Sequence, residues 1–287
     1  GVALYKKHQC DSIIAFGGGS PMDCAKGIAA RIARPNKSIK QLQGVLRVLR
    51  PVPTIYAVPT TAGTGSETTV AAVITCVKDH HKASINDIFL MPKYAVLDPE
   101  LTVGLPPHIT STTGMDALSH AVEAYTNSTY NTKLENDLAK KAVKLIYENL
   151  ETAYQDGSNL EARQNMQLAA FYAGRSFSRG CVGYVHAIGH ALGGLYNTPH
   201  GVAMSALLPL VMKKYGKAAH LRLAELYDAS GMQRGAHTTE EKANAFIAWM
   251  EEMKVRMNIP MYPPTLELKD IDEIAERAYK EGNPLYP

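Results

Sequence analysis

The hydrophobic pattern of this chain changes at about Pro106, and that change limits the folds it can adopt. Before Pro106, short apolar runs alternate with glycine-rich or polar turns, which is typical of strands joined by turns. The expected strands are Ser12–Phe16, Thr54–Val58, Val70–Val77, Ser84–Leu90 and Tyr94–Leu97. A helix is expected from Pro21 to about Arg34, with Ser20 as its N-cap and Asp23 closing a capping box.

After Pro106 apolar residues recur at helical spacing. The expected helices are Asp116–Tyr125, Leu134–Leu150, Leu160–Phe177, Val185–Leu192, Ala206–Tyr215, Ala218–Tyr227, Thr239–Met253 and Ile271–Tyr279. We therefore predict an α/β domain over residues 1–106 and an all-helical domain over residues 107–287.

Composition excludes several classes of protein. With 287 residues, 46% of them hydrophobic, the chain can bury a core in each of two domains. A net charge of +3 without dense basic blocks argues against nucleic acid and anionic membranes as partners. Cys10, Cys24, Cys76 and Cys181 form no CxxC pair, which favours a reducing compartment. No apolar run approaches the roughly 20 residues of a membrane span, so we predict a cytoplasmic enzyme.

Two glycine-containing loops are candidates for binding phosphate. Gly17-Gly18-Gly19-Ser20 follows an apolar run and precedes a helix, an order in which backbone N–H groups can face an anion. The pattern is not GxGxxG, so it predicts a phosphate site without an ordinary dinucleotide fingerprint. The loop from Thr60 to Glu67 is a second, weaker candidate.

A carboxylate and several imidazoles recur at spacings that suit a metal ion. Asp116 and His120 are four residues apart, as are His186 and His190, and His200 follows in a turn. Side chains four apart share a helix face, so two helices and a turn can surround one cation. This donor set suits Fe(II), Zn(II), Mn(II) or Co(II) better than calcium. The spacing alone does not tell which of the five is not a ligand.

Each of these residues also has a simpler explanation. His120, His186 and His190 can be packed core histidines, and Asp116 can close a capping box with Thr113. The aspartate and the histidines occur together in short segments rich in small apolar residues. This joint occurrence favours a metal site over the separate explanations.

Four motifs together resemble the iron-containing (group III) alcohol dehydrogenases, the family of lactaldehyde reductase and 1,3-propanediol dehydrogenase. They occur in family order and cover almost the whole chain. The motifs are Gly17-Gly18-Gly19-Ser20-Pro21-Met22-Asp23, Pro59-Thr60-Thr61-Ala62-Gly63-Thr64-Gly65-Ser66-Glu67, Gly114-Met115-Asp116-Ala117-Leu118-Ser119-His120, and His186-Ala187-Ile188-Gly189-His190 with Pro199-His200-Gly201.

The resemblance implies a Rossmann-like nucleotide-binding domain followed by a helical metal-binding domain, in the dehydroquinate synthase-like arrangement. It implies a homo-oligomer that binds Fe(II), or alternatively Zn(II), together with NAD or NADP. By the family pattern His190 lies beside the metal and moves or positions a proton. The implied metal ligands are Asp116, His120, His186 and His200. The implied cofactor-binding residues are Gly18, Gly19, Ser20, Thr60, Thr61, Thr64, Thr69, Lys82 and Thr102.

The chain departs from the family in two ways. It begins at Gly1 inside an expected helix, whereas family members are longer at both ends and carry their ribose-recognising segment earlier. The sequence therefore does not distinguish NAD from NADP. Met204 stands where the family usually has Asn, which is expected to alter how a metal ligand is oriented.

The predicted reaction interconverts a small primary alcohol or diol and its aldehyde by hydride transfer. Within the superfamily the alternative is a zinc glycerol dehydrogenase or a dehydroquinate synthase-like lyase. From other classes the alternatives are a metallohydrolase with Glu123 as general base and a non-catalytic fragment. By proximity to the ligands, the expected substrate-facing residues are Phe177, Cys181, Tyr184 and Tyr196.

Overall fold

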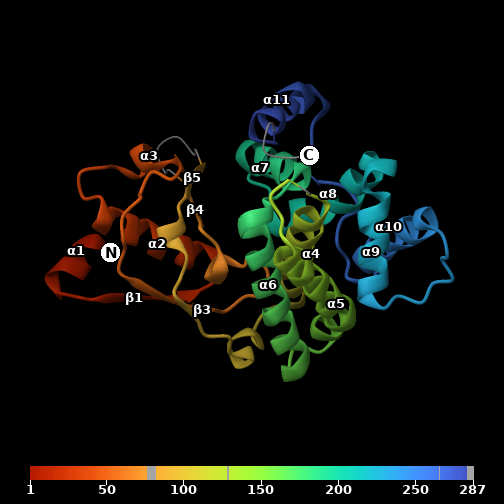
Figure 1. Ribbon diagram of the computed structural model, residues 1–287, viewed down its shortest axis with the longest axis horizontal. Coiled ribbons are helices and arrows are strands. Elements are labelled where there is room, and N and C mark those ends of the chain that lie inside the picture. The colour runs from red at the N-terminus through yellow and green to blue at the C-terminus, as the bar shows by residue number, and fades with distance from the viewer. Residues whose placement is uncertain (76–81, 128, 265, 283–287) are drawn as a thin grey trace.

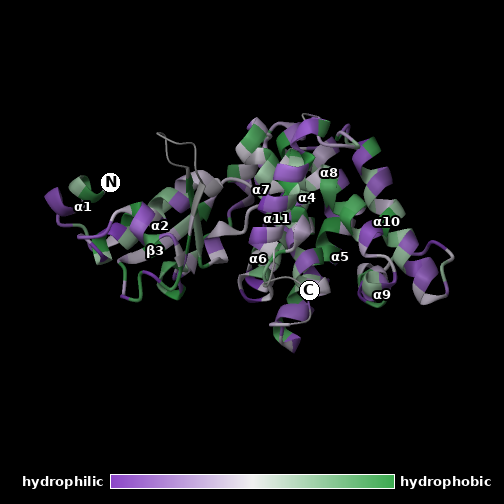
Figure 2. Cartoon of the chain, turned by 90° about the horizontal axis from the view of Figure 1, so that it is seen from above, coloured by the Kyte–Doolittle hydropathy of each residue, from purple (hydrophilic) through white to green (hydrophobic). Residues whose placement is uncertain are grey.

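The described strands all lie in the first third of the protein, together with three α-helices, and the rest is helical. The two parts lie side by side along the long axis (Figures 1 and 2). The computed structural model describes residues 1–75, 82–127, 129–264 and 266–282, with side chains described at all of these positions except 75, 82 and 83. This order of elements confirms the predicted fold class. A first short helix, α1 (Val2–Lys7), confirms the helix expected at the start of the chain.

One sheet is parallel, with strand order β1-β3-β6. It consists of β1 (Ser12–Gly17), β3 (Thr54–Pro59) and β6 (Tyr94–Ala95). Helix α2 (Gly19–Ala33) packs on one face, where small residues such as Ala15 and Ala57 let it approach closely. The other face carries exposed side chains, including Ile14, which is 72% exposed, so the first strand is buried on one face only.

A second small sheet has the order β2-β5-β4 and lies at the other side of α2. Here β2 (Gly44–Val45) pairs in parallel with β5 (Lys82–Asn86), and β4 (Ala71–Thr75) pairs with β5 in the antiparallel direction. The strand expected to reach Leu90 ends at Asn86. The reason is Asp87, whose carboxylate accepts a hydrogen bond from the Phe89 amide and caps a 3-10 helix, Ile88–Leu90. A short helix, α3 (Ile39–Leu42), precedes β2.

The predicted start of α2 is wrong. Its N-cap is Gly18, so Ser20 lies inside the first turn and closes no capping box. Asp23 instead accepts hydrogen bonds from the Ser66 hydroxyl (2.7 Å) and from the Val73 amide (3.0 Å). Glycine without a Cβ lets the chain turn directly from strand into helix here, so no side-chain cap is needed.

Every helix predicted after Pro106 is present, and most are longer than expected. They are α4 (Pro107–Thr126), α5 (Lys133–Gln155), α6 (Leu160–Gly180), α7 (Tyr184–Tyr196), α8 (His200–Tyr215), α9 (Lys217–Ser230), α10 (Thr239–Arg256) and α11 (Ile271–Gly282). The Thr113–Asp116 capping box is wrong, because α4 already starts at Pro107. The Thr113 hydroxyl instead donates to the Ile109 carbonyl, 2.7 Å away.

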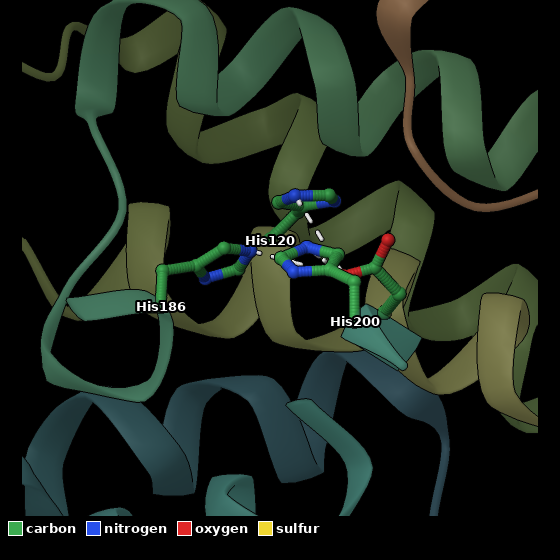
Figure 3. A group of neighbouring side chains, drawn as sticks. His120, His186 and His200 are labelled. Carbon is green, nitrogen blue, oxygen red and sulfur yellow. Dashed lines mark ion pairs between the residues drawn. The ribbon is translucent and has the colours of Figure 1, made fainter. Parts of the chain in front are cut away.

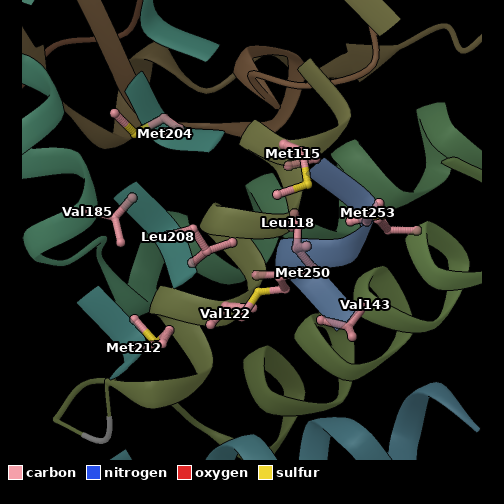
Figure 4. Packing of buried hydrophobic residues seen from close by; sticks show 14 of the residues in the cluster. Met115, Leu118, Val122, Val143, Val185, Met204, Leu208, Met212, Met250 and Met253 are labelled. Carbon is pink, nitrogen blue, oxygen red and sulfur yellow. The ribbon is translucent and has the colours of Figure 1, made fainter. Parts of the chain in front are cut away.

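Helix α4 is the centre of the helical part. Its residues from Gly114 to Tyr125 are all buried, and α5, α6, α8 and α9 pack around it. A helix buried on every side has no solvent-exposed face, so any polar residue in it needs a hydrogen-bond partner or a ligand. Around it the core is rich in methionine, and Met115, Met204 and Met212 fill gaps between helices (Figure 4).

Two further predictions concern the chain as a whole. Among the described residues, no helix combines the length and apolar character needed to cross a membrane. Cys10, Cys24 and Cys181 are free thiols, and Cys76 lies outside the described residues.

Candidate active site

Three helices bring the predicted metal ligands together. Asp116 and His120 come from buried α4, His186 comes from α7, and His200 is the first residue of α8. One ligand atom from each residue lies within 4.8 Å of every other (Figure 3). The start of α8 was expected at Ala206. The helix instead begins right after Pro199, so His200 is held by a helix terminus rather than by a free turn.

The spacing of the donor atoms fits a single cation. Asp116 Oδ1 lies 3.4 Å from His200 Nε2, 3.8 Å from His186 Nε2 and 3.9 Å from His120 Nε2. Bonds of about 2.0–2.2 Å around one ion would separate neighbouring donors by roughly 3–3.5 Å, so small side-chain movements suffice. Asp116 Oδ1 and His186 Nε2 are buried and find no hydrogen-bond partner among the described residues. Unpartnered buried donor atoms are what a metal site presents without its metal.

The electrostatics favour the protonation states that bind metal. Burial raises the pKa of Asp116, but the surrounding imidazoles more than offset this, and the net pKa lies below its usual range. Burial lowers the pKa of His120 to about 3 and that of His186 well below its usual value. A charged carboxylate beside the neutral imidazoles of His120 and His186 therefore faces the centre of the cluster.

Glu123 orients His186 from behind. The carboxylate is one more turn along α4 from His120, is buried, and contacts His186 Nδ1. It also accepts a hydrogen bond from the Val185 amide at 2.7 Å. Burial raises the pKa of Glu123 to about 7. Because Nδ1 is engaged by the carboxylate, Nε2 is left to bind a metal, so Glu123 is not placed as the general base of a hydrolase.

His190 lies beside the cluster but is not one of its four members. Its ring stacks on that of His200 at a centroid distance of 5.4 Å and meets His186 edge-on at 5.8 Å. Its Nδ1 lies 2.7 Å from Oε1 of Glu281 in α11. It is thus on the more open side of the site, where the side chain of His200 is 36% exposed.

The expected substrate-facing residues are held in different ways. The Phe177 ring stacks on His120 at 4.2 Å and covers one side of the cluster. Cys181 ends α6 with a positive φ of 62° and is half-buried. Tyr184 begins α7, and Tyr196 at its other end donates to Asp270. Met204 packs its side chain against Gly189, so this departure from the family fills space between α7 and α8.

The two predicted phosphate loops contact each other. A Cβ at Gly18 would lie 3.3 Å from Thr61 Cγ2, and one at Gly19 would lie 2.9 Å from Thr64 Cγ2. Glycine is therefore required here by the close approach of the second loop. The Thr61 hydroxyl is buried and finds no hydrogen-bond partner among the described residues. The N-terminus of α2, which has no side-chain cap, lies at the same place.

A buried lysine fixes the second loop to α2. Lys26 donates hydrogen bonds to Ser66 Oγ, Thr69 Oγ1 and the carbonyls of Thr69 and Ala71, at 2.8–3.0 Å. Asp23 holds the same Ser66 hydroxyl. Burial lowers the pKa of Lys26 to about 8 and raises that of Glu67 to about 7. The loop is therefore held by a polar network beneath it.

The remaining predicted cofactor residues are spread around these loops. Ser20 is exposed in the first turn of α2, and the Thr60 amide donates to the Gly17 carbonyl at 3.0 Å. The hydroxyl of Thr102 donates to the Pro99 carbonyl at 2.8 Å, which ties it into a local turn. Lys82 begins β5, and its side chain lies outside the described part of the structure.

Three residues at the site were not predicted in these roles. Glu123 was considered only as the general base of a hydrolase, and neither Lys26 nor Glu281 was singled out. The spacing Asp116, His120, Glu123 did place all three side chains on one face of α4, and this was the available signal for Glu123.

Comparison with known proteins covers both parts of the chain. A sequence profile described as iron-containing alcohol dehydrogenase matches residues 1–99. A second profile, for the C-terminal part of the Fe-containing alcohol dehydrogenase family, matches residues 110–285.

Individual proteins are similar over nearly the full chain. The 1,3-propanediol dehydrogenase of Klebsiella pneumoniae is 40% identical over 99% of this chain and 73% of its own length. A crystal structure of 1,3-propanediol oxidoreductase superposes with a TM-score of 0.93 at 38% identity, over 99% of this chain and 75% of that one. A sulfoacetaldehyde reductase from Bifidobacterium kashiwanohense, solved in complex with NAD+, gives a TM-score of 0.87 at 30% identity over 100% of this chain and 74% of that one.

Proposed function

The chain belongs to the iron-containing alcohol dehydrogenase family, and we propose that it interconverts a small primary alcohol or diol and its aldehyde at the Asp116 cluster. The family resemblance predicted from the motifs is confirmed, and the protein is an oxidoreductase. The observation that carries the proposal is the convergence of Asp116, His120, His186 and His200 within 4.8 Å.

The four clustered side chains would hold the cation. The donor set, one carboxylate and three imidazoles, fits Fe(II), with Zn(II) as the alternative occupant. A bound divalent ion supplies Lewis acidity that lowers the pKa of an alcohol oxygen. Glu123 keeps His186 in the ligating orientation, and the Phe177 ring on His120 shields that side from water.

The contacting loops would hold NAD or NADP. Gly18 and Gly19 let the Thr61 and Thr64 side chains approach the N-terminus of α2, whose backbone N–H groups would face a pyrophosphate. The Thr61 hydroxyl, which has no partner among the described residues, is available to bind it. The similar reductase was solved in complex with NAD+, which supports a nicotinamide cofactor for this chain. A nicotinamide cofactor supplies or accepts the hydride of the reaction. The resemblance also places Ser20, Thr60, Thr64, Thr69, Lys82 and Thr102 in this cleft. The Thr102 hydroxyl donates to the Pro99 carbonyl, so we propose that Thr102 lines the cleft without binding the cofactor directly.

His190 would accept the alcohol proton or position the group that does. It lies next to His200 on the open side of the cluster and is not one of the four clustered residues. A group in hydrogen-bond reach of the reacting oxygen can move its proton during hydride transfer.

Three finer assignments belong to this proposal. We infer that domains meet at about residue 106, since the described strands precede it and α4 follows it. The relatives include a 1,3-propanediol dehydrogenase and a sulfoacetaldehyde reductase, and we propose substrates of this size, facing Phe177, Cys181, Tyr184 and Tyr196. A cytoplasmic homo-oligomer remains a prediction.

The test is turnover by protein purified without oxygen. Iron and zinc are measured by elemental analysis, and reduction of NAD+ or NADP+ is followed by absorbance with 1,3-propanediol, ethanol and 1-butanol. We expect turnover that disappears on chelation and returns with iron or zinc. Full turnover after complete chelation would contradict the proposal, as would no turnover with any of these alcohols in protein that binds both metal and cofactor.

A further inference from the structure

Helix α11 delivers a carboxylate to His190, although it lies about ninety residues later in the chain. The Oε1 atom of Glu281 is 2.7 Å from His190 Nδ1. We propose that Glu281 is a positioning residue: it accepts the Nδ1–H hydrogen bond and thereby keeps His190 in the tautomer whose Nε2 can accept a proton. In a neutral imidazole, the nitrogen that donates a hydrogen bond to a carboxylate keeps the proton, and the other nitrogen is then free to accept one.

The docking of α11 on α7 fixes this contact. The two helices lie side by side in both views (Figures 1 and 2) and run antiparallel. At the far end of α7, Tyr196 donates to Asp270 at 2.6 Å. Ile274, Ala278 and Gly282 form the buried stripe of α11, one face at a spacing of four residues. Glu281 lies next to this stripe, so its position follows from the packing of the helix.

Glu281 differs from the other acidic residues of α11. Glu273 pairs with Arg277, and Glu276 pairs with Lys280, both within the helix and on its exposed side. The partner of Glu281 is on another helix and belongs to the site. The side chains of His190 and Glu281 are 30% and 39% exposed, so solvent screening makes the pair worth little to stability. Its effect is expected on orientation rather than on folding.

Among the described residues, Glu281 supplies the carboxylate that is hydrogen-bonded to His190. On α7, His190 faces the His186 ring, and it stacks on the His200 ring of α8. Those imidazoles are turned toward Asp116 through their Nε2 atoms. The tautomer of His190 is therefore controlled from α11.

The first arm of the test reads the tautomer directly and does not depend on turnover. Metal-free protein with nitrogen-15 histidine is studied by NMR, and the His190 signals are assigned with His190→Gln. We expect the Nδ1–H tautomer in the unsubstituted protein, in Glu276→Gln, in Asp270→Asn and in Glu281→Gln, whose amide oxygen still accepts. We expect a mixture in Glu281→Ala. An unchanged tautomer in Glu281→Ala would overturn the inference.

The second arm reads catalysis and rests on the proposed function. We expect kcat to fall about 10-fold in Glu281→Ala, with the KM for alcohol changed less than about 2-fold, and most of kcat to return in Glu281→Gln. Glu276→Gln is the matched control and keeps full kcat. Equal losses in Glu281→Ala and Glu281→Gln would contradict a positioning role. Absence of turnover in the unsubstituted protein would overturn the function, whereas the tautomer result would stand.

Discussion

Two buried polar clusters, one in each part of the molecule, differ in how their polar atoms are satisfied. In the helical part, Asp116 and His186 turn donor atoms toward a common point and leave them without partners among the described residues. In the strand-containing part, Lys26 donates to Ser66, Thr69 and Ala71 and is satisfied by the protein itself. We propose that an ion completes the first arrangement, and that the second holds a loop which contacts the cofactor.

This difference predicts which substitutions act on binding and which act on stability. A buried polar atom without a partner destabilises the protein until a ligand arrives, so its removal harms binding more than folding. A buried charge with a full set of partners stabilises a local structure, so its removal harms that structure first. The predictions below test this distinction.

The largest effect is expected for Asp116→Asn. The substitution removes the charge that faces three imidazoles, so metal affinity should fall by more than about 100-fold and turnover by more than about 1,000-fold. The thermal midpoint in chelator should change much less than the metal affinity, because Asp116 Oδ1 makes no hydrogen bond among the described residues. Elemental analysis and a thermal melt in chelator measure the two quantities.

Asp137→Asn is the control for this prediction, since Asp137 lies on the surface of α5 and pairs with Lys133, away from the Asp116 cluster. It should change neither metal content nor turnover. If Asp116→Asn kept its metal, the cluster would be an ordinary buried polar group and the contrast between the two parts would be lost.

The next effect is a pH dependence of stability from Lys26. Its pKa in the folded protein is lowered to about 8, below its ordinary value of 10.5. Between these two values the unfolded chain binds a proton that the folded protein has released, so the free energy of unfolding rises with pH. The rise attributable to Lys26 is at most about 3 kcal/mol. It is measured by urea unfolding between pH 8 and pH 10.5.

Lys254 serves to separate this contribution from others. It is buried in the helical part, donates to the carbonyls of Ala206 and Met261, and also has a pKa lowered to about 8. Lys26→Met and Lys254→Met should each reduce the rise of the free energy of unfolding with pH. Only Lys26→Met should weaken NAD binding. Equal cofactor affinity in both variants would show that the Lys26 network does not position the loop.

A smaller loss is expected for Glu123→Gln. Glu123 uses one oxygen for the Val185 amide and the other for His186 Nδ1, and an amide group can accept at only one of these. Metal affinity should therefore fall by about 10-fold, at the lower end of the range for such partners. Competition with a chromophoric chelator measures it.

Glu135→Gln is the control that measures the effect of changing a buried glutamate that does not contact the Asp116 cluster. Glu135 is also a buried helix carboxylate, but it accepts from Thr132 at the start of α5. We expect lower stability and unchanged metal affinity. If both glutamate variants lost metal equally, the loss would come from the fold and not from the orientation of His186.

Local spacing explains what the sequence could predict. The four-residue spacing of Asp116 and His120 depends only on helix geometry, so the proximity of these two side chains on α4 could be predicted without knowledge of the packing. The same holds for the helices themselves, whose apolar stripes are repeated at 3.6 residues. The strand runs before Pro106 were predicted on the same basis.

Long-range contacts explain what it could not predict. His186 and Glu123 are 63 residues apart, and their contact depends on how α7 packs against α4. Lys26 and Thr69 meet only because α2 lies against the loop after β3. The Ser20 cap failed because the close approach of the Thr61 and Thr64 side chains, rather than a side-chain cap, determines the glycine turn.

The smallest effects are expected for two threonines of the predicted cofactor cleft. The Thr61 hydroxyl has no partner among the described residues, whereas the Thr102 hydroxyl donates to Pro99. Thr61→Val should weaken NAD binding about 5-fold and leave the free energy of unfolding equal or higher. Thr102→Val should lower that free energy by about 1 kcal/mol and leave NAD binding within about 2-fold.

These two variants compare the two kinds of buried polar group most directly, because each removes one hydroxyl group from a threonine that is at least half-buried. Calorimetric titration gives the affinity for NAD, and urea unfolding of the metal-free protein gives the stability. If Thr102→Val instead weakened NAD binding and Thr61→Val only destabilised the fold, the unpartnered hydroxyl would not mark the ligand site. The strand-containing part would then bind its cofactor through groups that already make hydrogen bonds within the protein. The Asp116 cluster differs, because its donor atoms Asp116 Oδ1 and His186 Nε2 have no hydrogen-bond partner among the described residues.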